Sequence, residues 1–414
     1  MKIDGEITLP GDKSISHRSL IFGALTSGTS KLFNLSDGED VKSTISCLKD
    51  CNVKIVEKKN YTTVNGKEYS KPNKALHCGN SGTTARLLAG FLANRKIDAT
   101  LVGDKSLSKR PMHRIIKPLR EMGSIIESND NFLPIKIKAN TLHGIDYQSQ
   151  ISSAQLKSCI LIASLNANTK TTFTEPYLSR NHTELLLKSL GAKIYTKKNR
   201  VEIMPFQNLN AFDIKIPSDI SSASFFITAA LLMPDSKLYF KNILLNETRL
   251  GFIKILKKNG ADISTSTEKI VHGEKVGNLT INYSTIKPFK INKEKIPSMI
   301  DEIPLLAILA TKAKGISIVR GAKELRYKEC DRIKAICQNL KRMNAKVKEL
   351  EDGFIVEGPS DLEPRKIHTF NDHRIAMAFT VLNKSLNGTY YLDNTNCIKI
   401  SYPNFIKDMN SLMQ

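Results

Sequence analysis

Residues 187–194, LKSLGAKI, contain the pattern that decides the fold. The first residues end an amphipathic helix, the glycine can adopt the left-handed conformation that terminates it, and the last residues begin a strand. The pattern recurs at Leu48–Ile55, Leu119–Ile126, Leu256–Ile263 and Leu340–Val347, with Asn in place of Gly in the first and last copies. Successive copies start 71, 68, 69 and 84 residues apart. Leu-x-x-x-Gly is also a common helix ending, but this near-even spacing favours a repeat of helix and strand.

The repeat predicts the domain organisation. A further helix at Asn404–Leu412 follows about one period after the last copy, so six units of about 70 residues account for the 414-residue chain. This period is too long for an ankyrin or tetratricopeptide solenoid. We therefore expect an α/β fold of two domains with three units each, and a break near Pro217–Ser218. Helices are expected at Arg114–Met122 and Glu184–Leu190, and strands at Ile194–Ile203 and Phe354–Val356.

Composition narrows the class of partner. The formal net charge is +22, but Lys and Arg are spread along the whole chain and no basic run is interleaved with aromatic residues. This pattern favours a cationic pocket for anionic metabolites over nucleic acid. No run of 18 apolar residues occurs and the N-terminus is charged, so we expect no membrane span, no signal peptide and a cytoplasmic protein. The seven cysteines form no C-x-x-C pair and are interpreted as reduced thiols, without a metal site.

Several expected helix starts carry cations. Lys13 and Arg18 lie at the start of a helix that Ser14 or Ser16 can cap. The segment GNSGTTAR (79–86) is a glycine-rich turn before another helix, but it lacks the ending of a Walker A loop. Arg110 lies beside a third start, where Pro111 suits the first helical position. Each feature alone is also typical of an ordinary capped surface helix.

The rest of the chain repeats this pattern with other chemistry. SSAQ (152–155) opens a helix with hydroxyl and amide groups that can orient a polyhydroxylated ring. In the C-terminal half, DEIP (301–304), YKECDR (327–332) and NDHR (371–374) each precede an apolar helix. The acidic pair of DEIP can also be an ordinary helix cap, and the alternating charges of YKECDR can form surface salt bridges. In NDHR, Asn371 or Asp372 is expected to cap the helix. Together, the segments suit a pair of small anionic substrates held between two domains.

Over its whole length the chain resembles the 5-enolpyruvylshikimate-3-phosphate synthase family of enolpyruvyl transferases. The matching segments run in order: PGDKSISHR, GNSGTTARLL, KRPM, SSAQLKS, EPYLSRNHTE, SDISSASFF, IDEIP, YKECDR, NDHRIAMAF and SYPNF. The forms SRNHTE and SAQLKS are similar to the family's class II branch. The resemblance implies a two-domain inside-out α/β barrel of six units. It also implies a discontinuous first domain, 1–12 and 218–414, a second domain, 13–217, and hinges near 12–13 and 217–218.

The resemblance also implies the chemistry. The family transfers the enolpyruvyl group of phosphoenolpyruvate to the 5-hydroxyl of shikimate 3-phosphate, in chorismate and aromatic amino acid biosynthesis, without a metal or cofactor. By resemblance Asp301 is the base, and Glu329 and Lys13 handle protons at the enolpyruvyl group. Burial would raise the pKa of Glu329 and nearby cations would lower it, and the balance stays open here. The implied substrate contacts are Lys13, Ser14, Arg18, Gly82, Arg110, Ser153, Ala154, Gln155, Ser179, Asp301, Lys328, Arg332 and Arg374.

Further expectations follow from the resemblance. The two domains should close on the substrates, and the protein should act as a monomer. The herbicide glyphosate occupies the phosphoenolpyruvate site in this family and depends on a glycine that matches Gly82. Two positions depart from the pattern: Ile400, with Lys399 beside it, replaces a lysine, and Glu324 replaces an asparagine. Neither Lys399 nor Glu324 is therefore assigned a substrate contact.

Two alternatives explain parts of the sequence. The sister family that uses UDP-N-acetylglucosamine typically has Lys-Asn where this chain has Lys13-Ser14, and a cysteine before the Arg-Pro step. Here no cysteine lies between Cys78 and Cys159, which disfavours that family. A basic scaffold that binds RNA would explain the net charge. It would not explain the acidic Asp301 and Glu329 among cationic helix starts.

Overall fold

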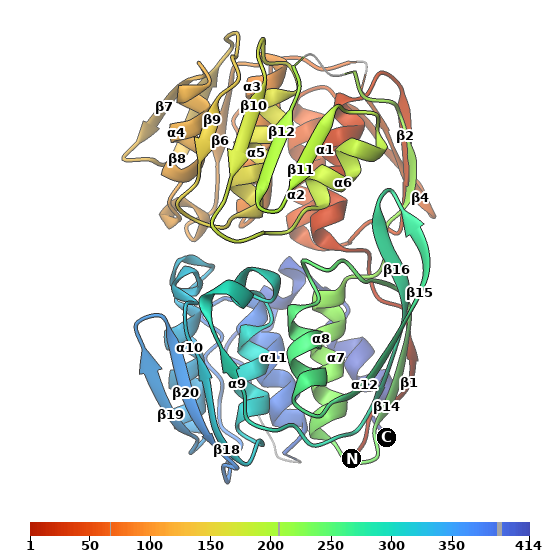
Figure 1. Cartoon of the computed structure of the whole chain (residues 1–414), viewed down its shortest axis with the longest axis vertical. Coiled ribbons are helices and arrows are strands. Elements are labelled where there is room, and N and C mark those ends of the chain that lie inside the picture. Colours follow the sequence, from red (N-terminus) through yellow and green to blue (C-terminus); the bar gives the residue numbers. More distant parts are fainter. Residues whose placement is uncertain (67, 206–207, 387–390) are drawn as a thin grey trace. The chain divides into compact units, whose positions relative to one another are not determined.

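A computed structural model describes residues 1–66, 68–205, 208–386 and 391–414. The chain forms two compact units (Figure 1). The first contains residues 1–10, 217–269 and 275–414, and the second contains residues 11–216 and 270–274. The sequence did not indicate that residues 270–274 belong to the second unit.

In the ranges that the structure describes, the second unit contains three four-stranded sheets with one common plan. In each sheet the first pair of neighbours is parallel and the other two pairs are antiparallel. The strands, in their order across each sheet, are β13 (Asp213–Lys215), β2 (Thr29–Phe33), β4 (Tyr61–Asn65) and β3 (Lys54–Glu57); β5 (Leu76–His77), β6 (Ala99–Val102), β8 (Phe132–Lys138) and β7 (Ile125–Asn129); and β9 (Asp146–Gln148), β10 (Thr171–Thr174), β12 (Arg200–Ile203) and β11 (Ile194–Lys197).

Among its described residues, the first unit contains two sheets with the same strand order. They are β1 (Asp4–Ile7), β14 (Lys237–Leu244), β16 (Glu274–Asn282) and β15 (Asp262–Val271); and β17 (Lys290–Ile291), β18 (Gly315–Val319), β20 (Gly353–Gly358) and β19 (Lys346–Leu350). A parallel bridge also joins Ile367 to Leu392.

Three of the five sheets described above, those that begin with β5, β9 and β17, are built in chain order from a strand, a helix, a strand, a second helix and a hairpin. Two sheets take their first strand from a distant part of the chain, because β1 pairs with β14 and β13 pairs with β2. Residues 1–10, which include β1, therefore belong to the first unit. The second unit follows and ends with β13, the edge strand of its first sheet. From residue 217 on, most of the chain belongs to the first unit again. This exchange of strands makes the first unit discontinuous.

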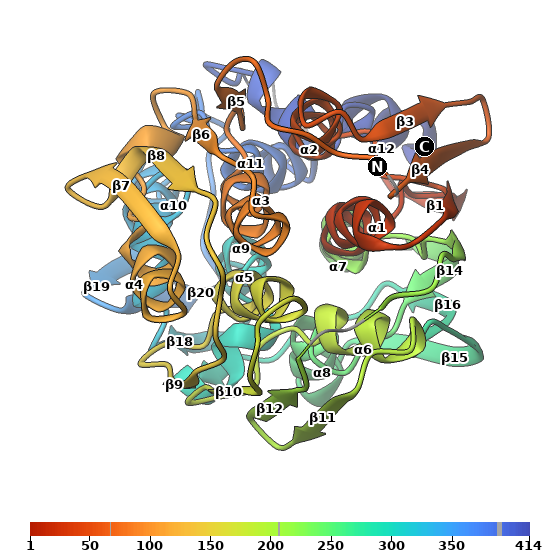
Figure 2. The same ribbon diagram turned by 90° about the horizontal axis from the view of Figure 1, so that it is seen from above.

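In the part of the chain that the structure describes, each unit has three helices that are buried almost all around. Their sequences are apolar or small on every face, as in SLIFGAL or LLAGFLA, which is typical of helices in a core. The second unit contains α1 (Lys13–Leu25), α3 (Gly82–Arg95) and α5 (Ala154–Ser164), and the first contains α7 (Ile220–Leu232), α9 (Ile303–Ala310) and α11 (His373–Lys384). Figure 2 shows α1, α3 and α5 inside, with the strands of the second unit around them.

The remaining helices are partly exposed. Among them, α4 and α10 alternate buried apolar residues with exposed charged ones at helical spacing. In the described ranges, no helix is both long and apolar enough to cross a bilayer. The elements are α2 (Glu39–Asp50), α4 (His113–Glu121), α6 (His182–Ser189), α8 (Gly251–Lys258), α10 (Arg332–Arg342) and α12 (Phe405–Leu412), with short 3-10 helices η1 (Leu107–Lys109), η2 (Lys293–Ser298), η3 (Lys323–Tyr327) and η4 (Asn396–Ile400).

The five sequence repeats have the predicted local structure. In every copy a helix ends, one residue adopts positive φ, and a strand follows. The residues with positive φ are Asn52, Gly123, Gly191, Gly260 and Asn344. The predicted single strand Ile194–Ile203 was wrong: a turn, with Lys198 at φ 53°, divides it into β11 and β12.

Candidate active site

The second unit brings the N-terminal ends of α1, α3 and α5 together, through contacts between residues of their first two turns. Nη2 of Arg18 donates to Oγ of Ser158 at 2.7 Å, and Nη1 of Arg86 donates to Oε1 of Gln155 at 2.5 Å. Nε2 of Gln155 donates to Oγ1 of Thr83 at 2.9 Å. The N-terminus of a helix has a positive dipole end and N–H groups without helical partners. Three such ends in one place suit phosphate or carboxylate groups.

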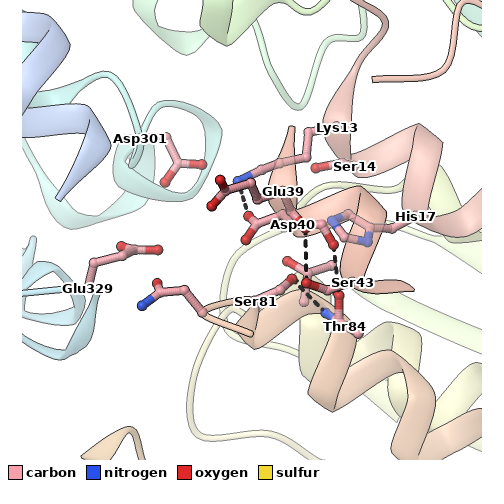
Figure 3. Close-up of polar contacts among 12 residues, drawn as sticks. Lys13, Ser14, His17, Glu39, Asp40, Ser43, Ser81, Thr84, Asp301 and Glu329 are labelled. Atoms are coloured by element: carbon pink, nitrogen blue, oxygen red, sulfur yellow. Dashed lines mark hydrogen bonds and ion pairs between the residues drawn. The ribbon is translucent and has the colours of Figure 1, made fainter. Parts of the chain in front are cut away.

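Lys13, the first residue of α1, adds a positive charge at this place. Its Nζ lies 2.7 Å from Oδ2 of Asp40 in α2 (Figure 3). The Lys13 side chain is 18% exposed and that of Asp40 is 8% exposed. An anion that binds the ammonium group must therefore share it with Asp40.

Arg18 is buried within the same group. Its Nε donates to Oγ1 of Thr183 and its Nη1 to the carbonyl of Ser14, both at 2.8 Å. Nη1 of Arg180 donates to Oγ of Ser14 at 3.3 Å. Burial lowers the pKa of Arg18 to about 10, although Glu184 opposes this effect. Arg18 is therefore still a cation at neutral pH, and the serine whose carbonyl it contacts also accepts a hydrogen bond from Arg180 through its hydroxyl.

Gly82 faces two guanidinium groups. A Cβ at this position would lie 3.0 Å from Nη1 of Arg86 and 3.5 Å from Nη1 of Arg110. Nη1 of Arg110 donates to the carbonyl of Asn80 at 3.1 Å, and its Nη2 donates to Oδ1 of the same residue at 2.5 Å. The glycine thus keeps the space in front of both cations free of a side chain.

The start of α5 and the segment before α6 contribute hydroxyl groups. Oγ of Ser153 accepts from the backbone N–H of Leu156 at 3.3 Å, so Ser153 caps α5, and Ala154 is the first helical residue. The backbone N–H and the hydroxyl of Ser179 both donate to Oε1 of Glu175, at 2.8 and 3.0 Å.

In the first unit, three carboxylates surround the buried Arg332. Nε lies 2.8 Å from Asp372, Nη2 lies 2.6 Å from Glu329, and Nη1 lies 3.3 Å from Asp301. The Arg332 side chain is 2% exposed. Burial acts to lower the pKa of Arg332, but the three carboxylates together raise it above its ordinary value. The guanidinium is therefore always charged.

Asp301 and Glu329 are the more accessible members of this cluster. Both side chains are 15% exposed, whereas Asp372 is fully buried. Nζ of Lys328 lies 3.6 Å from Oδ1 of Asp301. Asp301 is thus a carboxylate between two cations, at the start of α9, and it is partly open to solvent.

Arg374 joins the cluster indirectly. Asp372, which contacts Arg332, also caps α11 by accepting from the backbone N–H of Arg374 at 2.8 Å. The Arg374 guanidinium is buried, 5.8 Å from the centre of the Phe225 ring. Asp372 was one of the two predicted caps.

Two predicted helix starts were wrong. Asp12 caps α1 by accepting from Ile15 N at 2.8 Å, because the helix begins at Lys13, one turn earlier than a Ser16 cap requires. The helix after Arg110 begins at His113, so Pro111 precedes it instead of occupying its first position. The cap of α3 is Ser81, whose Oγ accepts from the N–H of Thr84 at 3.1 Å (Figure 3).

The candidate residues fall into two groups. In the first unit they are connected through contacts to Arg332 and Asp372, whereas in the second unit they belong to several smaller hydrogen-bond networks. The second unit contains Lys13, Ser14, Arg18, Gly82, Arg110, Ser153, Ala154, Gln155 and Ser179, and the first contains Asp301, Lys328, Glu329, Arg332 and Arg374.

Sequence reasoning missed several members of these networks. Arg86 is the last residue of the glycine-rich segment GNSGTTAR. A cation one turn after the start of a helix was the feature of the sequence that could have identified it. No local pattern marks Asp40, Arg180 or Lys157 as part of the networks. Of the two departures from the family pattern, Lys399 is exposed beside the buried Ile400.

Within the described ranges, no group of three or more His, Cys, Asp or Glu side chains is arranged to hold a metal ion. All seven cysteines are free, and six of them are buried.

Over almost its whole length the chain is similar to one family of known proteins. The profile of the family described as EPSP synthase (3-phosphoshikimate 1-carboxyvinyltransferase) matches residues 1–409. A 3-phosphoshikimate 1-carboxyvinyltransferase of a Thermoanaerobacter species is 44% identical, over 99% of this chain and 98% of that protein. One from Oceanobacillus iheyensis is 42% identical, over 100% and 97%. The solved structure of an EPSP synthase from Acinetobacter baumannii has a TM-score of 0.87 and 38% identity, and covers 99% of this chain and 96% of that chain.

Proposed function

Because the chain belongs to the EPSP synthase family, we propose that it transfers the enolpyruvyl group of phosphoenolpyruvate to the 5-hydroxyl of shikimate 3-phosphate. The products are 5-enolpyruvylshikimate 3-phosphate and inorganic phosphate. The observation that carries this proposal is that the chain contains two kinds of site, one in each unit. One unit gathers cations at three helix starts, and the other holds two partly exposed carboxylates beside a permanently charged arginine.

The reaction is an addition followed by an elimination. A proton is added to the methylene carbon of phosphoenolpyruvate, and the 5-hydroxyl loses its proton as its oxygen bonds to the adjacent carbon. This gives a tetrahedral ketal phosphate. The carbon–oxygen bond to phosphate then breaks, a methyl proton is removed, and the double bond re-forms. The protein must supply an acid, a base and positive charge for the phosphate groups.

Asp301 is proposed as the base that takes the proton of the 5-hydroxyl. Its carboxylate is partly exposed, and the cations of Lys328 and Arg332 hold it from two sides, so its position is defined while one face stays accessible. Glu329, 2.6 Å from Arg332, and Lys13 are proposed to move protons at the enolpyruvyl carbons.

The binding residues are assigned by charge and by hydrogen-bonding capacity. For phosphoenolpyruvate we propose Lys13, Arg110, Arg332 and Arg374, with the backbone at Gly82 and the amide of Gln155. For shikimate 3-phosphate we propose Ser14, Arg18, Ser153, Ala154, Gln155, Ser179 and Lys328. The proposal requires residues of both units to act on the same pair of substrates.

The fold proposal follows the five sheets described above. We propose that the segment around α11 and α12, with its bridge between Ile367 and Leu392, is a sixth copy of the repeat. This would give each unit three copies around its three buried helices.

A phosphate-release assay tests the function. Release should require both substrates together, and the enolpyruvyl product should form in equal amount by mass spectrometry. Asp301→Asn and Lys13→Met should abolish both signals in proteins that remain folded. Lys49→Met is the control, because Lys49 forms an exposed ion pair with Glu57. Phosphate release from phosphoenolpyruvate alone at the same rate would contradict the proposal.

A further inference from the structure

Lys157, in the first turn of α5, is the centre of a buried ionic cluster. Its Nζ lies 2.8 Å from Oε1 of Glu175 and 2.8 Å from Oε1 of Glu184. The lysine side chain is 0% exposed, and the carboxylates are 1% and 3% exposed. The ammonium group also lies 3.4 Å from the carbonyl oxygen of Ser179.

The two glutamates stand at the ends of one segment, residues 175–184. This segment begins directly after β10 and ends in the first turn of α6. Between its ends lie Ser179, held by Glu175, and Arg180, whose Nη1 contacts Oγ of Ser14. Lys157 thus contacts both ends and the middle of the segment that carries these two groups.

The cluster also reaches Arg18. Ser158, the residue after Lys157, and Thr183, the residue before Glu184, hydrogen bond to each other at 2.7 Å. Both hydroxyls accept from Arg18. A shift of α6 relative to α5 would therefore move the acceptors that orient the Arg18 guanidinium.

Among the described residues, no other cation forms an ion pair with either glutamate, although Ser179 also donates to Glu175. Oε2 of Glu175 and Oε2 of Glu184 are buried, and neither has a hydrogen-bond partner among the described residues. Burial acts to lower the pKa of Lys157, but Glu184 and Glu175 together raise it above its ordinary value, so the lysine is charged. Without this cation, two carboxylates would remain buried, and that arrangement is strongly unfavourable.

We propose that Lys157 is a positioning residue: by holding both ends of residues 175–184 against α5, it fixes Ser179 and orients Arg18 and Arg180 toward the phosphate of shikimate 3-phosphate. The inference rests on the proposed function and deepens it, because it assigns a role to a lysine that does not touch the substrate. A purely structural ion cluster would stabilise the protein without affecting one substrate more than the other.

The test separates stability from substrate binding. K157M should raise the KM for shikimate 3-phosphate by about tenfold or more, equivalent to about 1.4 kcal/mol, with a smaller change in kcat and in the KM for phosphoenolpyruvate. K157M/E184Q removes one carboxylate together with the cation. It should recover part of the stability lost in K157M, because one buried carboxylate fewer remains, but keep the raised KM, because the ends of the segment are still not held. The double variant decides the question if K157M does not fold.

The control is I162V, which trims a buried residue of the same helix. It should lower stability and leave both KM values unchanged. The chain contains no tryptophan, so binding of shikimate 3-phosphate is measured by titration calorimetry. A wild-type protein that binds no shikimate 3-phosphate contradicts the proposed function itself. A K157M or K157M/E184Q protein that binds it as tightly as wild type, or that weakens for both substrates equally, overturns only the role of Lys157.

Discussion

Nη2 of Arg332 lies 2.6 Å from Oε2 of Glu329, within one turn at the start of α10. The arginine is buried and the glutamate is partly exposed. The pair therefore presents a carboxylate to solvent from a fixed position, since its partner cannot move without breaking contacts to Asp372 and Asp301. This is the geometry that a proton-transferring group needs.

Glu329→Gln should lower kcat by about 10²–10⁴-fold, the usual contribution of a general acid or base. Glutamine keeps the volume and an oxygen that can accept from Arg332, but it cannot take or give a proton at neutral pH. Steady-state kinetics of phosphate release measure the effect. Glu351→Gln, at an exposed carboxylate paired with Lys323, is the control and should behave as wild type. An unchanged kcat in Glu329→Gln would remove this residue from the mechanism.

Arg332→Met should destabilise the protein by about 3–5 kcal/mol, because it leaves partly or fully buried carboxylates without their cation. Urea unfolding at pH 7 measures the loss. Arg342→Met, on the exposed side of the last turn of the same helix, should stay within about 0.5 kcal/mol of wild type. If both variants unfold at the same urea concentration, the cluster around Arg332 is not formed as described.

Gly82→Ala should weaken inhibition by glyphosate by about tenfold or more, the effect that one methyl group has in a tight pocket. The new Cβ would lie 3.0 Å from Nη1 of Arg86 and occupy space before Arg110. Inhibition constants against phosphoenolpyruvate are compared for the two proteins. Equal constants would show that this space is not where the inhibitor binds.

His17 should make the protein sensitive to mild acid. Burial, and then the charges of Lys13 and Arg18, lower the pKa of His17 well below 6.5. The unfolded chain therefore binds a proton that the folded chain does not. Protonation of His17 therefore does not affect the free energy of unfolding above about pH 6.5. Below this pH the free energy of unfolding falls by about 1.4 kcal/mol per pH unit, until the pH reaches the pKa of His17 in the folded chain.

The comparison of His17→Asn with wild type measures this contribution. Urea midpoints between pH 7.5 and 5 should fall less steeply for His17→Asn, because the variant has no ring to protonate. The exposed His143→Asn serves as control and should follow wild type. Parallel curves for wild type and His17→Asn would show that another group causes the acid sensitivity.

The local parts of the fold could be predicted from the sequence. Asn52 and Gly191 each follow a helix and tolerate positive φ, and both adopt it where the repeat placed a helix end. The exchange of β1 and β13 could not be predicted from the repeat alone, because strand pairing between β1 and β14 depends on contacts more than 200 residues apart.

The site was predictable to the extent that it lies at helix starts. Arg18, Gly82 and Arg332 stand in short segments whose composition indicates an anion site. Partners such as Asp40 or Lys157 become visible only when the helices pack, because nothing in their own neighbourhood distinguishes them from ordinary helical residues. The sequence thus indicated where charged candidate residues lie along the helices, whereas the groups that contact them became clear only from the structure.

The fate of the bridging oxygen of phosphoenolpyruvate tests the central claim most directly. Phosphoenolpyruvate labelled with oxygen-18 between carbon and phosphorus is incubated with the protein and shikimate 3-phosphate, and the phosphate is analysed by mass spectrometry. Enolpyruvyl transfer breaks the carbon–oxygen bond, so the label should appear in inorganic phosphate. Unlabelled phosphate, with the label kept in pyruvate, would mean that the phosphorus–oxygen bond breaks and that the protein is not an enolpyruvyl transferase.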